Sequence, residues 1–534
     1  MGRNRPLVRS AAADAAGDTG AARRTGVADT DDGTGRTGRC GPGRREGGTS
    51  APSRPRASTL VTAALAVSAA LAAVVGCAPA PGPGHAPGTL SAPPRSGTPA
   101  ARESPGCHRT LVAVAHPDDD LFFLNPRIRD TIRAGCPVDT VFLTAGDGGK
   151  KDPTAAREYV DRRQYGVRAA YAEMAEAANR WDRDDVPAGG VTVRSYRLAD
   201  QARNTDVRLT FLDLHDGLPE GQQPNSMRRL LTGETREIEA FQGGARYTEQ
   251  RLLDTVSDLA RLARADRILT LDHDNASFAF GLGGGVDHAD HGTGARYVRR
   301  VGYALGIPVT AYLGYTMSPL APNLTPGQVA EKDEVARWYL ANRTCHANGT
   351  CASVAPYRGT LRKDWSLWVH RQYEVVHRAP RPGELLGDIG RTTTHAAGRD
   401  PARCLDPGGT PPAAGPVRLR RCAGSPAQRW DIGGDGTIRP RADRSRCLTA
   451  LGPSAGLEPC ATGRAEQRWT REPWPDTTWK RTAWRIAGAG NRCLYQDDRQ
   501  FPAHWADRDR QDPGLTLADC GGPPRPELYW RWGG

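Results

Sequence analysis

The chain has 534 residues, of which 38% are hydrophobic and 25% charged, and its formal net charge is +12. This length exceeds one ordinary domain, and the hydrophobic content is enough for two or three units with cores of their own. Residues 1–58 hold eleven arginines against six acidic residues, so five of the twelve excess charges lie there. Because no basic helix or aromatic-interleaved basic patch occurs elsewhere, the charge argues against nucleic acid as a partner.

The first 58 residues form a Gly/Ala/Arg/Asp-rich stretch without apolar periodicity, which predicts a disordered extension. An apolar run from Leu60 to Val75 follows, and Gly76-Cys77 comes directly after it. Because the run is short for a membrane span and is preceded by arginines, we predict a secretory signal peptide over residues 59–77. An extension ahead of a signal peptide is unusual, so either residues 1–58 are such an extension or translation starts downstream of Met1.

The Val-Gly-Cys ending of this segment resembles a bacterial lipobox. The resemblance implies a lipid on Cys77, which would become the mature N-terminus and anchor the protein to a membrane. A plain signal peptide or a signal anchor is the alternative. Residues 78–106 are rich in Pro, Gly, Ala and Ser, and they predict a flexible linker.

Twelve cysteines occur in the sequence. Apart from Cys40 and Cys77, an even number remains, as is typical of an oxidising compartment. The spacing lacks the C-x-x-C pairs of a zinc ribbon. The order suggests that neighbours pair: Cys107 with Cys136, Cys345 with Cys351, Cys404 with Cys422, Cys447 with Cys460, and Cys493 with Cys520. We therefore expect an extracellular protein that is lipid-anchored to the cell membrane or secreted.

Residues 107–378 alternate between short β-branched runs and helical segments. This alternation predicts an α/β domain with a Rossmann-like, mostly parallel sheet and helices on both faces. The expected strands are 110–115, 138–144, 206–213, 267–272 and 307–313. The expected helices are 121–134, 154–178, 247–264, 293–305 and 325–342. A linker is predicted over residues 379–399.

Two histidine motifs follow strand-like segments of this domain. They are His116-Pro117-Asp118-Asp119-Asp120 and His288-Ala289-Asp290-His291. Ligands bind at this edge of open α/β sheets, and a catalytic zinc centre takes three protein ligands and leaves the fourth position to water. The spacing lets His116 and Asp119 converge on one ion, with His291 as the third ligand. Asp118 is then free to act as a base, and His288 would face the reacting group.

These motifs resemble the PIG-L-type zinc deacetylases, which remove acetyl or related acyl groups from amino sugars. That family carries Ala-His-Pro-Asp-Asp-Glu after its first strand and His-x-Asp-His later, and the resemblance covers residues 107–378. It implies zinc ligands at His116, Asp119 and His291, and a general base at Asp118. It also implies an acid or oxyanion stabiliser at His288, which Asp290 orients and charges. One departure is Asp120, where the family usually has Glu, at a position that is not a ligand.

Simpler explanations exist for each motif alone. An Asp-rich loop before a helix often only caps the helix, and an isolated His pair is more often structural than metal-binding. Both motifs together, in this order on one edge of the sheet, favour a zinc site. Asp216-Gly217 is interpreted as a turn, with substrate contact as the alternative. Asp272 and His273 are left without a role.

Residues 400–534 change to short strands with many Gly and Pro. Three blocks begin Cys404-Leu405-Asp406, Cys447-Leu448-Thr449 and Cys493-Leu494-Tyr495, and the first two close on Gln-Arg-Trp. A unit that occurs three times at about 40 to 50 residues predicts three β units around a pseudo-threefold axis. This pattern resembles the ricin-type β-trefoil lectins.

The lectin resemblance implies a sugar-binding Asp at Asp406, and the other two blocks lack that acid. Residues 417–422, where the family has an aromatic residue for stacking, carry none. The alternative is a structural or degenerate trefoil. Trp430 and Trp469 are expected to pack in the core.

Together these features predict an extracellular, Zn²⁺-dependent hydrolase that removes an N-acetyl or N-acyl group from an amino sugar or glycan by metal-activated water. The trefoil would hold the enzyme near polymer. Two other functions stay open: a non-catalytic carbohydrate-binding lipoprotein, and an amidase that acts on an acylated small metabolite. The sequence does not indicate the oligomeric state.

Overall fold

The computed structural model describes residues 107–199, 206–275, 278, 286–341, 355–391, 401–409, 412, 414–473, 483–499 and 512–534. The expected extension, the signal peptide with Cys77, the linker 78–106 and the Cys345–Cys351 pair lie outside these residues. Among the described residues, no helix is long and apolar enough to cross a membrane.

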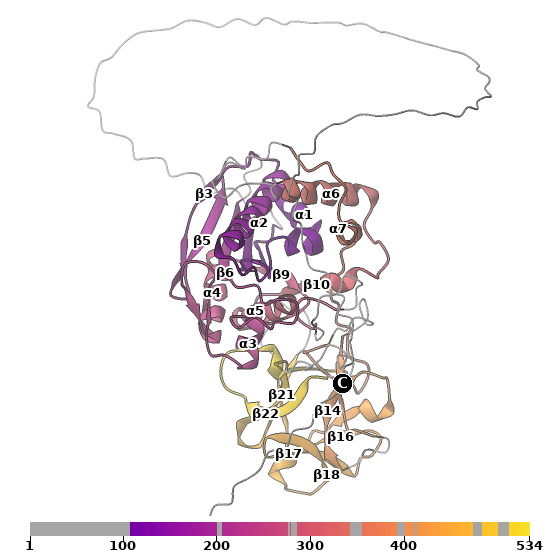
Figure 1. Cartoon of the computed structure of the whole chain (residues 1–534). Coiled ribbons are helices and arrows are strands. Elements are labelled where there is room, and N and C mark those ends of the chain that lie inside the picture. The colour runs from indigo at the N-terminus through magenta and orange to yellow at the C-terminus, as the bar shows by residue number, and fades with distance from the viewer. Residues whose placement is uncertain are drawn as a thin grey trace, which may run out of the picture. The chain divides into compact units, whose positions relative to one another are not determined.

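A mixed, mostly parallel sheet forms the centre of the N-terminal domain (Figure 1). Its strand order is β10-β9-β1-β2-β6-β5-β3, and β4 pairs with β5. The strands from β10 to β6 run parallel, whereas β5, β3 and β4 are antiparallel. The bounds are β1 Thr110–Val114, β2 Val138–Thr144, β3 Trp181–Arg183, β4 Val186–Ala188, β5 Val191–Leu198, β6 Val207–Leu214, β9 Arg267–Leu271 and β10 Val309–Tyr312, with a separate hairpin of β7 Ile238–Glu239 and β8 Arg246–Tyr247. The five predicted strands are confirmed, and the three antiparallel strands are additional.

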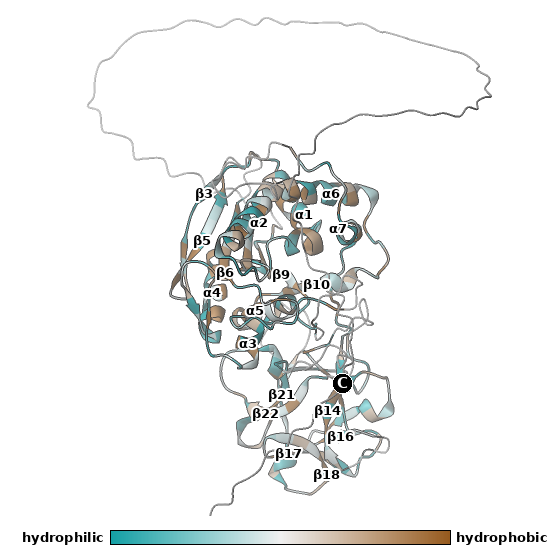
Figure 2. Cartoon of the chain, viewed as in Figure 1, coloured by the Kyte–Doolittle hydropathy of each residue, from teal (hydrophilic) through white to brown (hydrophobic). Residues whose placement is uncertain are grey.

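Helices cover both faces of this sheet. Side chains of α2, α6 and α7 join one apolar core, and side chains of α3, α4 and α5 join another. The bounds are α1 Arg127–Arg133, α2 Pro153–Met174, α3 Met227–Thr232, α4 Glu249–Leu262, α5 Ala289–Leu305, α6 Pro326–Ala341 and α7 Lys363–Trp368. In Figure 2, α4 carries both hydrophobic and hydrophilic residues, as expected for a helix with one buried side. The helix predicted over 121–134 is in fact two pieces, a π-helical turn η1 (Asp120–Leu124) and α1, separated by Pro126.

The C-terminal domain is all-β, and its core repeats three times. Trp430, Trp469 and Trp530 are buried together, and each donates its indole N–H to a backbone carbonyl near the start of its own block. The acceptors are Leu405, Leu448 and Leu494, at 2.9, 2.8 and 3.1 Å. Equivalent bonds in all three blocks support the predicted pseudo-threefold repetition, and the tryptophans are packing residues.

The strands of this domain begin earlier than expected. β11 (Leu385–Gly387) pairs with β12 and β23, so the predicted linker 379–399 contains a strand of the trefoil sheet. The remaining bounds are β12 Arg403–Asp406, β13 Gly415–Pro416, β14 Arg418–Arg421, η5 Pro426–Gln428, β15 Trp430–Ile432, β16 Ile438–Pro440, β17 Arg446–Leu451, β18 Ser454–Pro459, η6 Ala465–Gln467, β19 Thr470–Pro473, β20 Trp484–Gly488, η7 Ala489–Asn491, β21 Arg492–Asp497, β22 Gly514–Asp519, η9 Pro526–Leu528 and β23 Tyr529–Trp532.

Four of the five predicted disulfides are present. They are Cys107–Cys136, Cys404–Cys422, Cys447–Cys460 and Cys493–Cys520. Each of the three blocks of the trefoil contains one of these disulfides, and each disulfide closes a loop within its own block. Disulfide-rich small domains of this kind are typical of oxidising compartments.

Helix α5 contacts the trefoil through buried charges. The Arg300 guanidinium donates to Asp498 and to Glu527, both at 2.6 Å, and Arg299 lies 3.4 Å from Asp498. Tyr303, near the end of the same helix, packs in an apolar cluster with Tyr529 and other trefoil residues. The same helix carries the second histidine motif at its other end.

Candidate metal centre

The first motif occupies a tight loop between β1 and η1. The backbone carbonyl of Asp118 accepts hydrogen bonds from Leu121 and Phe122, which turns the chain directly into η1. Asp118 itself has a φ of 142°, a value that non-glycine residues rarely adopt and that commonly marks a functional site. The Asp119 carboxylate accepts the backbone N–H of His116 at 2.6 Å, which holds the Asp119 side chain against the loop.

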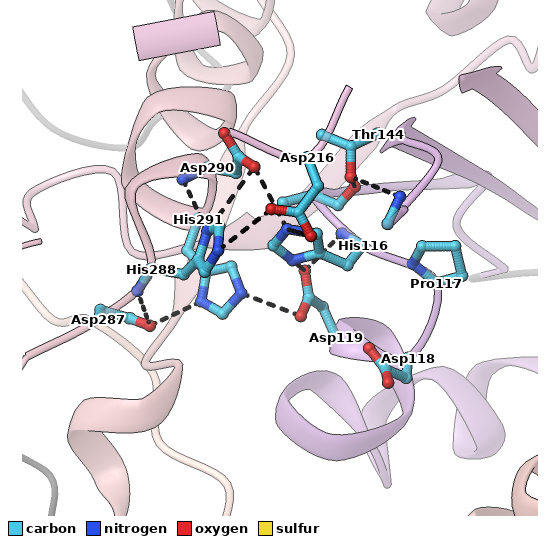
Figure 3. Close-up of polar contacts among 12 residues, drawn as sticks. His116, Pro117, Asp118, Asp119, Thr144, Asp216, Asp287, His288, Asp290 and His291 are labelled. Carbon is cyan, nitrogen blue, oxygen red and sulfur yellow. Dashed lines mark hydrogen bonds and ion pairs between the residues drawn. The ribbon is translucent and has the colours of Figure 1, made fainter. Parts of the chain in front are cut away.

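The second motif forms the first turn of α5. His288 is the N-cap residue, and its Nδ1 accepts the backbone N–H of Asp290 at 3.2 Å. Asp290 and His291 are fully buried in this first turn. Since α5 packs beside β1, its N-terminus comes to the carboxyl end of that strand, and the two motifs meet (Figure 3).

The three predicted ligands lie together. Asp119 bridges the two histidines: one carboxylate oxygen is 3.2 Å from His116 Nδ1, and the other is 3.0 Å from His291 Nε2. The three side chains are buried, and their ligand atoms are close enough to share one ion. Asp120 is also fully buried but is not part of either group that could hold an ion here, which agrees with a position that is not a ligand.

A second, overlapping group shares His116. Its Nε2 lies 3.3 Å from Asp290 and 3.8 Å from Asp216, and Asp216 is also 3.4 Å from His288 Nε2. The sequence interpretation of Asp216 as a turn residue was incomplete. Its carboxylate does accept the Leu218 N–H at 2.9 Å, as an Asp in a turn often does, but it also faces both histidines.

Asp118 is placed apart from these groups, at the edge of the cluster in Figure 3. One of its carboxylate oxygens accepts from Arg163 of α2 at 2.7 Å, and the other accepts from the Tyr339 hydroxyl of α6 at 2.9 Å. Arg163 also donates to the carbonyls of Gly146 and Pro117, and the Tyr339 hydroxyl, whose single proton is shared with Asp118, lies 3.1 Å from the Pro117 carbonyl. The two side chains therefore fix the orientation of the loop as well as that of Asp118.

The electrostatics of the cluster favour a bound cation. Burial lowers the pKa of His291, but the carboxylates of Asp119 and Asp287 raise it to about 10. In the same way, burial opposes the charge on His116 and Asp119 raises its pKa well above the usual value. Burial raises the pKa of Asp119, yet His291 and then His116 hold it well below the usual value. A carboxylate that draws positive charge onto two buried imidazoles suits a metal ion, which would replace their protons.

Unsatisfied nitrogen atoms give a separate test of the fit to a metal. Among the described residues, His116 Nε2 and His291 Nε2 are buried and form no well-aligned hydrogen bond, although carboxylates of Asp290 and Asp119 lie 3.3 and 3.0 Å away. Buried polar atoms rarely lack a hydrogen bond unless they serve a site. Two imidazole nitrogens and a carboxylate are also the donors that zinc prefers. The residues present therefore fit a metal of this kind.

Comparisons with known proteins agree with this geometry. Residues 111–301 match the PIG-L family, described as GlcNAc-PI de-N-acetylase. This PIG-L segment contains both histidine motifs. Residues 392–496 match the ricin-type beta-trefoil lectin domain. Both resemblances inferred from the sequence are thus confirmed.

Individual relatives are distant or cover little of the chain. The probable alpha-galactosidase A of Aspergillus clavatus is 45% identical over 49 residues, and the match spans 9% of this chain and 9% of that protein. The N,N'-diacetylchitobiose deacetylase from Pyrococcus horikoshii is 13% identical with a TM-score of 0.27, covering 45% of this chain and 72% of that one. Teicoplanin deacetylase Orf2, solved in a zinc-inhibited form, is 13% identical with a TM-score of 0.26, covering 43% and 83%. The earthworm R-type lectin C-half is 12% identical with a TM-score of 0.19, covering 28% and 94%.

Asp406, the predicted sugar-binding residue of the trefoil, forms hydrogen bonds within the trefoil itself. The Asp406 carboxylate accepts from the backbone N–H of Gly408 at 2.7 Å and from the Gln428 amide at 2.8 Å. Its neighbour on the paired strand is Arg418, and no aromatic residue occurs on β14. The position therefore has a fixed acid but lacks a stacking surface from that strand.

Proposed function

We propose that the PIG-L segment is a zinc-dependent N-deacetylase that acts on an N-acetylated amino sugar or a glycan containing one. The observation that carries this proposal is the buried group of His116, Asp119 and His291 within the matched family segment. In this proposal those three residues hold the metal. A bound zinc ion would polarise the amide carbonyl and lower the pKa of a coordinated water to about 7.

Asp118 is the proposed general base. Burial raises the pKa of Asp118, and Arg163 lowers it only in part, so the carboxyl group is a better proton acceptor than an exposed Asp. Each of its oxygens accepts one hydrogen bond, from Arg163 or Tyr339, and retains a lone pair for a proton from water. Held in this way, Asp118 does not need to reorganise during proton transfer.

His288 is the proposed oxyanion stabiliser. Because its Nδ1 accepts the Asp290 N–H, the ring proton of neutral His288 is on Nε2. An Nε2–H of this kind is the donor needed to stabilise the negative charge of a tetrahedral intermediate. Asp290 is the proposed orienting partner of His288 through its backbone N–H; its carboxylate accepts from Gly217 at 2.7 Å and lies nearer to His116 than to His288.

The location and the trefoil complete the proposal. The four disulfides support export to an oxidising compartment, and we propose that the mature protein is extracellular, with a lipid anchor at Cys77 or in secreted form. The trefoil would keep the enzyme near glycan, with Asp406 as the candidate sugar contact.

Acetate release is the test of this function. The full chain, with and without a chelator, is incubated with N-acetylglucosamine oligomers, peptidoglycan fragments and acylated small molecules, and acetate and free amines are measured. Chelator-sensitive release from the sugars supports the proposal. Metal binding without release from any substrate would indicate a non-catalytic protein, and release from the small molecules alone would indicate an amidase.

A further inference from the structure

Asp287 borders the site beside His291, although no motif pointed to it (Figure 3). It is fully buried and directly precedes His288. One oxygen of its carboxylate, Oδ1, accepts three hydrogen bonds: from His291 Nδ1 at 2.7 Å, from the backbone N–H of His288 at 2.9 Å and from that of Tyr315 at 3.3 Å. Asp287 thus connects a proposed metal ligand, the proposed oxyanion stabiliser and the turn after β10.

The contact with His291 fixes a proton on one nitrogen of that ring. A carboxylate only accepts hydrogen bonds, so Nδ1 of His291 carries a proton. The other nitrogen, Nε2, is the one that faces Asp119 at 3.0 Å. A neutral His291 in this tautomer therefore presents its free lone pair toward the cluster and not away from it.

The surroundings hold both side chains in this arrangement. A Cβ atom on Gly314 would lie 2.5 Å from Asp287 Oδ2 and 2.9 Å from His291 Nδ1, so glycine is needed for the turn after β10 to approach so closely. The neighbouring Tyr315 ring packs against the His291 ring with centroids 4.9 Å apart and stacks on Trp368 at 5.1 Å. The imidazole is therefore held by a hydrogen bond at Nδ1 and by packing against the Tyr315 ring.

We propose that Asp287 is a positioning residue for metal binding, which sets the tautomer and the direction of His291, and that Gly314 makes room for it. This inference rests on the proposed metal-dependent function, because it requires that the site holds a metal. Carboxylate partners of metal-binding histidines typically change metal affinity by about 10- to 100-fold when they are removed.

The test measures Zn²⁺ affinity of the full chain by competition with a chromogenic chelator. Asp287→Ala removes the acceptor, and Asp287→Asn retains an acceptor oxygen without the charge. We expect about 10- to 100-fold weaker binding for the Ala variant and a smaller loss for Asn, together with loss of the His291 Nδ1–H signal in ¹H–¹⁵N spectra of the Ala variant. Gly314→Ala should also weaken binding, since it displaces the same carboxylate.

Two controls separate this effect from general damage to the fold. Asp213→Asn alters another buried carboxylate, which pairs with Arg194 and Gln164 outside the cluster, and it should leave Zn²⁺ affinity unchanged. Gly327→Ala places a methyl group in open space and should also have no effect. Thermal unfolding of each variant shows that it is folded.

Wild-type affinity in folded Asp287→Ala would overturn the inference, and so would equal losses in Asp287→Ala and Asp213→Asn. A chain that binds Zn²⁺ through Asp287 but releases no acetate would overturn the proposed deacetylase while this inference stands. An unmodified chain that binds no Zn²⁺ would overturn both.

Discussion

Replacement of Asp498 tests how the trefoil is attached to α5. The side chain is fully buried and lies between two buried guanidinium groups, those of Arg299 and Arg300. Asp498→Asn keeps the volume of the side chain but removes its charge, so two buried arginines lose a counter-ion. Breaking a buried ion pair by removing one partner typically costs about 3–5 kcal/mol of unfolding free energy. Glu527 still neutralises part of Arg300, so we expect the lower end of that range.

The matched control is Asp431→Asn. Asp431 also pairs with two arginines, Arg441 and Arg444, each at 2.7 Å, but its side chain is 33% exposed. Exposed ion pairs contribute about 0–1 kcal/mol, so this variant should be nearly as stable as the unmodified chain. Urea unfolding, followed by tryptophan fluorescence and by acetate release in parallel, measures both variants.

The refuting result is equal stability of the two variants. It would mean that water or other carboxylates solvate the buried arginines when Asp498 is neutralised. The contact between the trefoil and α5 would then contribute little to the free energy of unfolding. Acid gives an independent check. Burial raises the pKa of Asp498, but Arg300 and then Arg296 hold it at about 2, below an unfolded value of about 3.9. The stabilisation from Asp498 is therefore present above pH ~4 and lost as the pH falls toward about 2, and Asp498→Asn should lack this dependence.

Four further results are expected. His291→Ala should lose bound zinc, because two protein ligands hold it poorly; stoichiometric zinc in that variant, measured by elemental analysis, would refute the ligand assignment. Asp118→Asn should keep its zinc but lower turnover by about 100-fold, and zinc loss instead would show that Asp118 is a ligand. Cys447→Ser should lower the melting temperature, since disulfides of this kind contribute about 2–4 kcal/mol; an unchanged value would refute that contribution. Asp406→Asn should abolish glycan binding by the full chain if this is the sugar contact, and unchanged retention on glycan resin would assign a structural role to the trefoil.

The clustering of the three candidate ligands was predictable because each motif is local in sequence. His116 and Asp119 share one loop, and His291 lies in one helical turn with His288; the resemblance to the PIG-L signature implied that the two motifs meet. The partners of Asp118 were not predictable, since Arg163 and Tyr339 come from helices 45 and 221 residues away. No spacing rule connects such positions; only the packing of α2 and α6 on one face of the sheet brings them to the loop.

Asp216 and Asp287 show a different limit of the sequence. Each stands in a segment where Asp is an ordinary turn residue, and Asp216 does form the turn contact that was expected. The sequence does not show that the carboxylates of Asp216 and Asp287 also face the histidines of the site. Those contacts depend on where α5 meets β1. The antiparallel strands β3 and β4 escaped prediction for a simpler reason, because each has only three residues, too few for a clear alternation. The eight-residue β5 was missed because its apolar residues are interrupted by Arg194, Ser195 and Arg197.

Helix α5 gives these observations a common physical basis. Its first turn carries His288, Asp290 and His291, and its second half carries Arg299, Arg300 and Tyr303, which contact the trefoil. At a rise of 1.5 Å per residue, His291 and Arg299 are about 12 Å apart along one rigid element. A trefoil that served only as a tether would need no buried charges at this helix, and its loss would leave Arg299 and Arg300 without Asp498. We therefore expect that removing the trefoil destabilises the metal centre itself, and that activity on small soluble substrates falls along with activity on polymer.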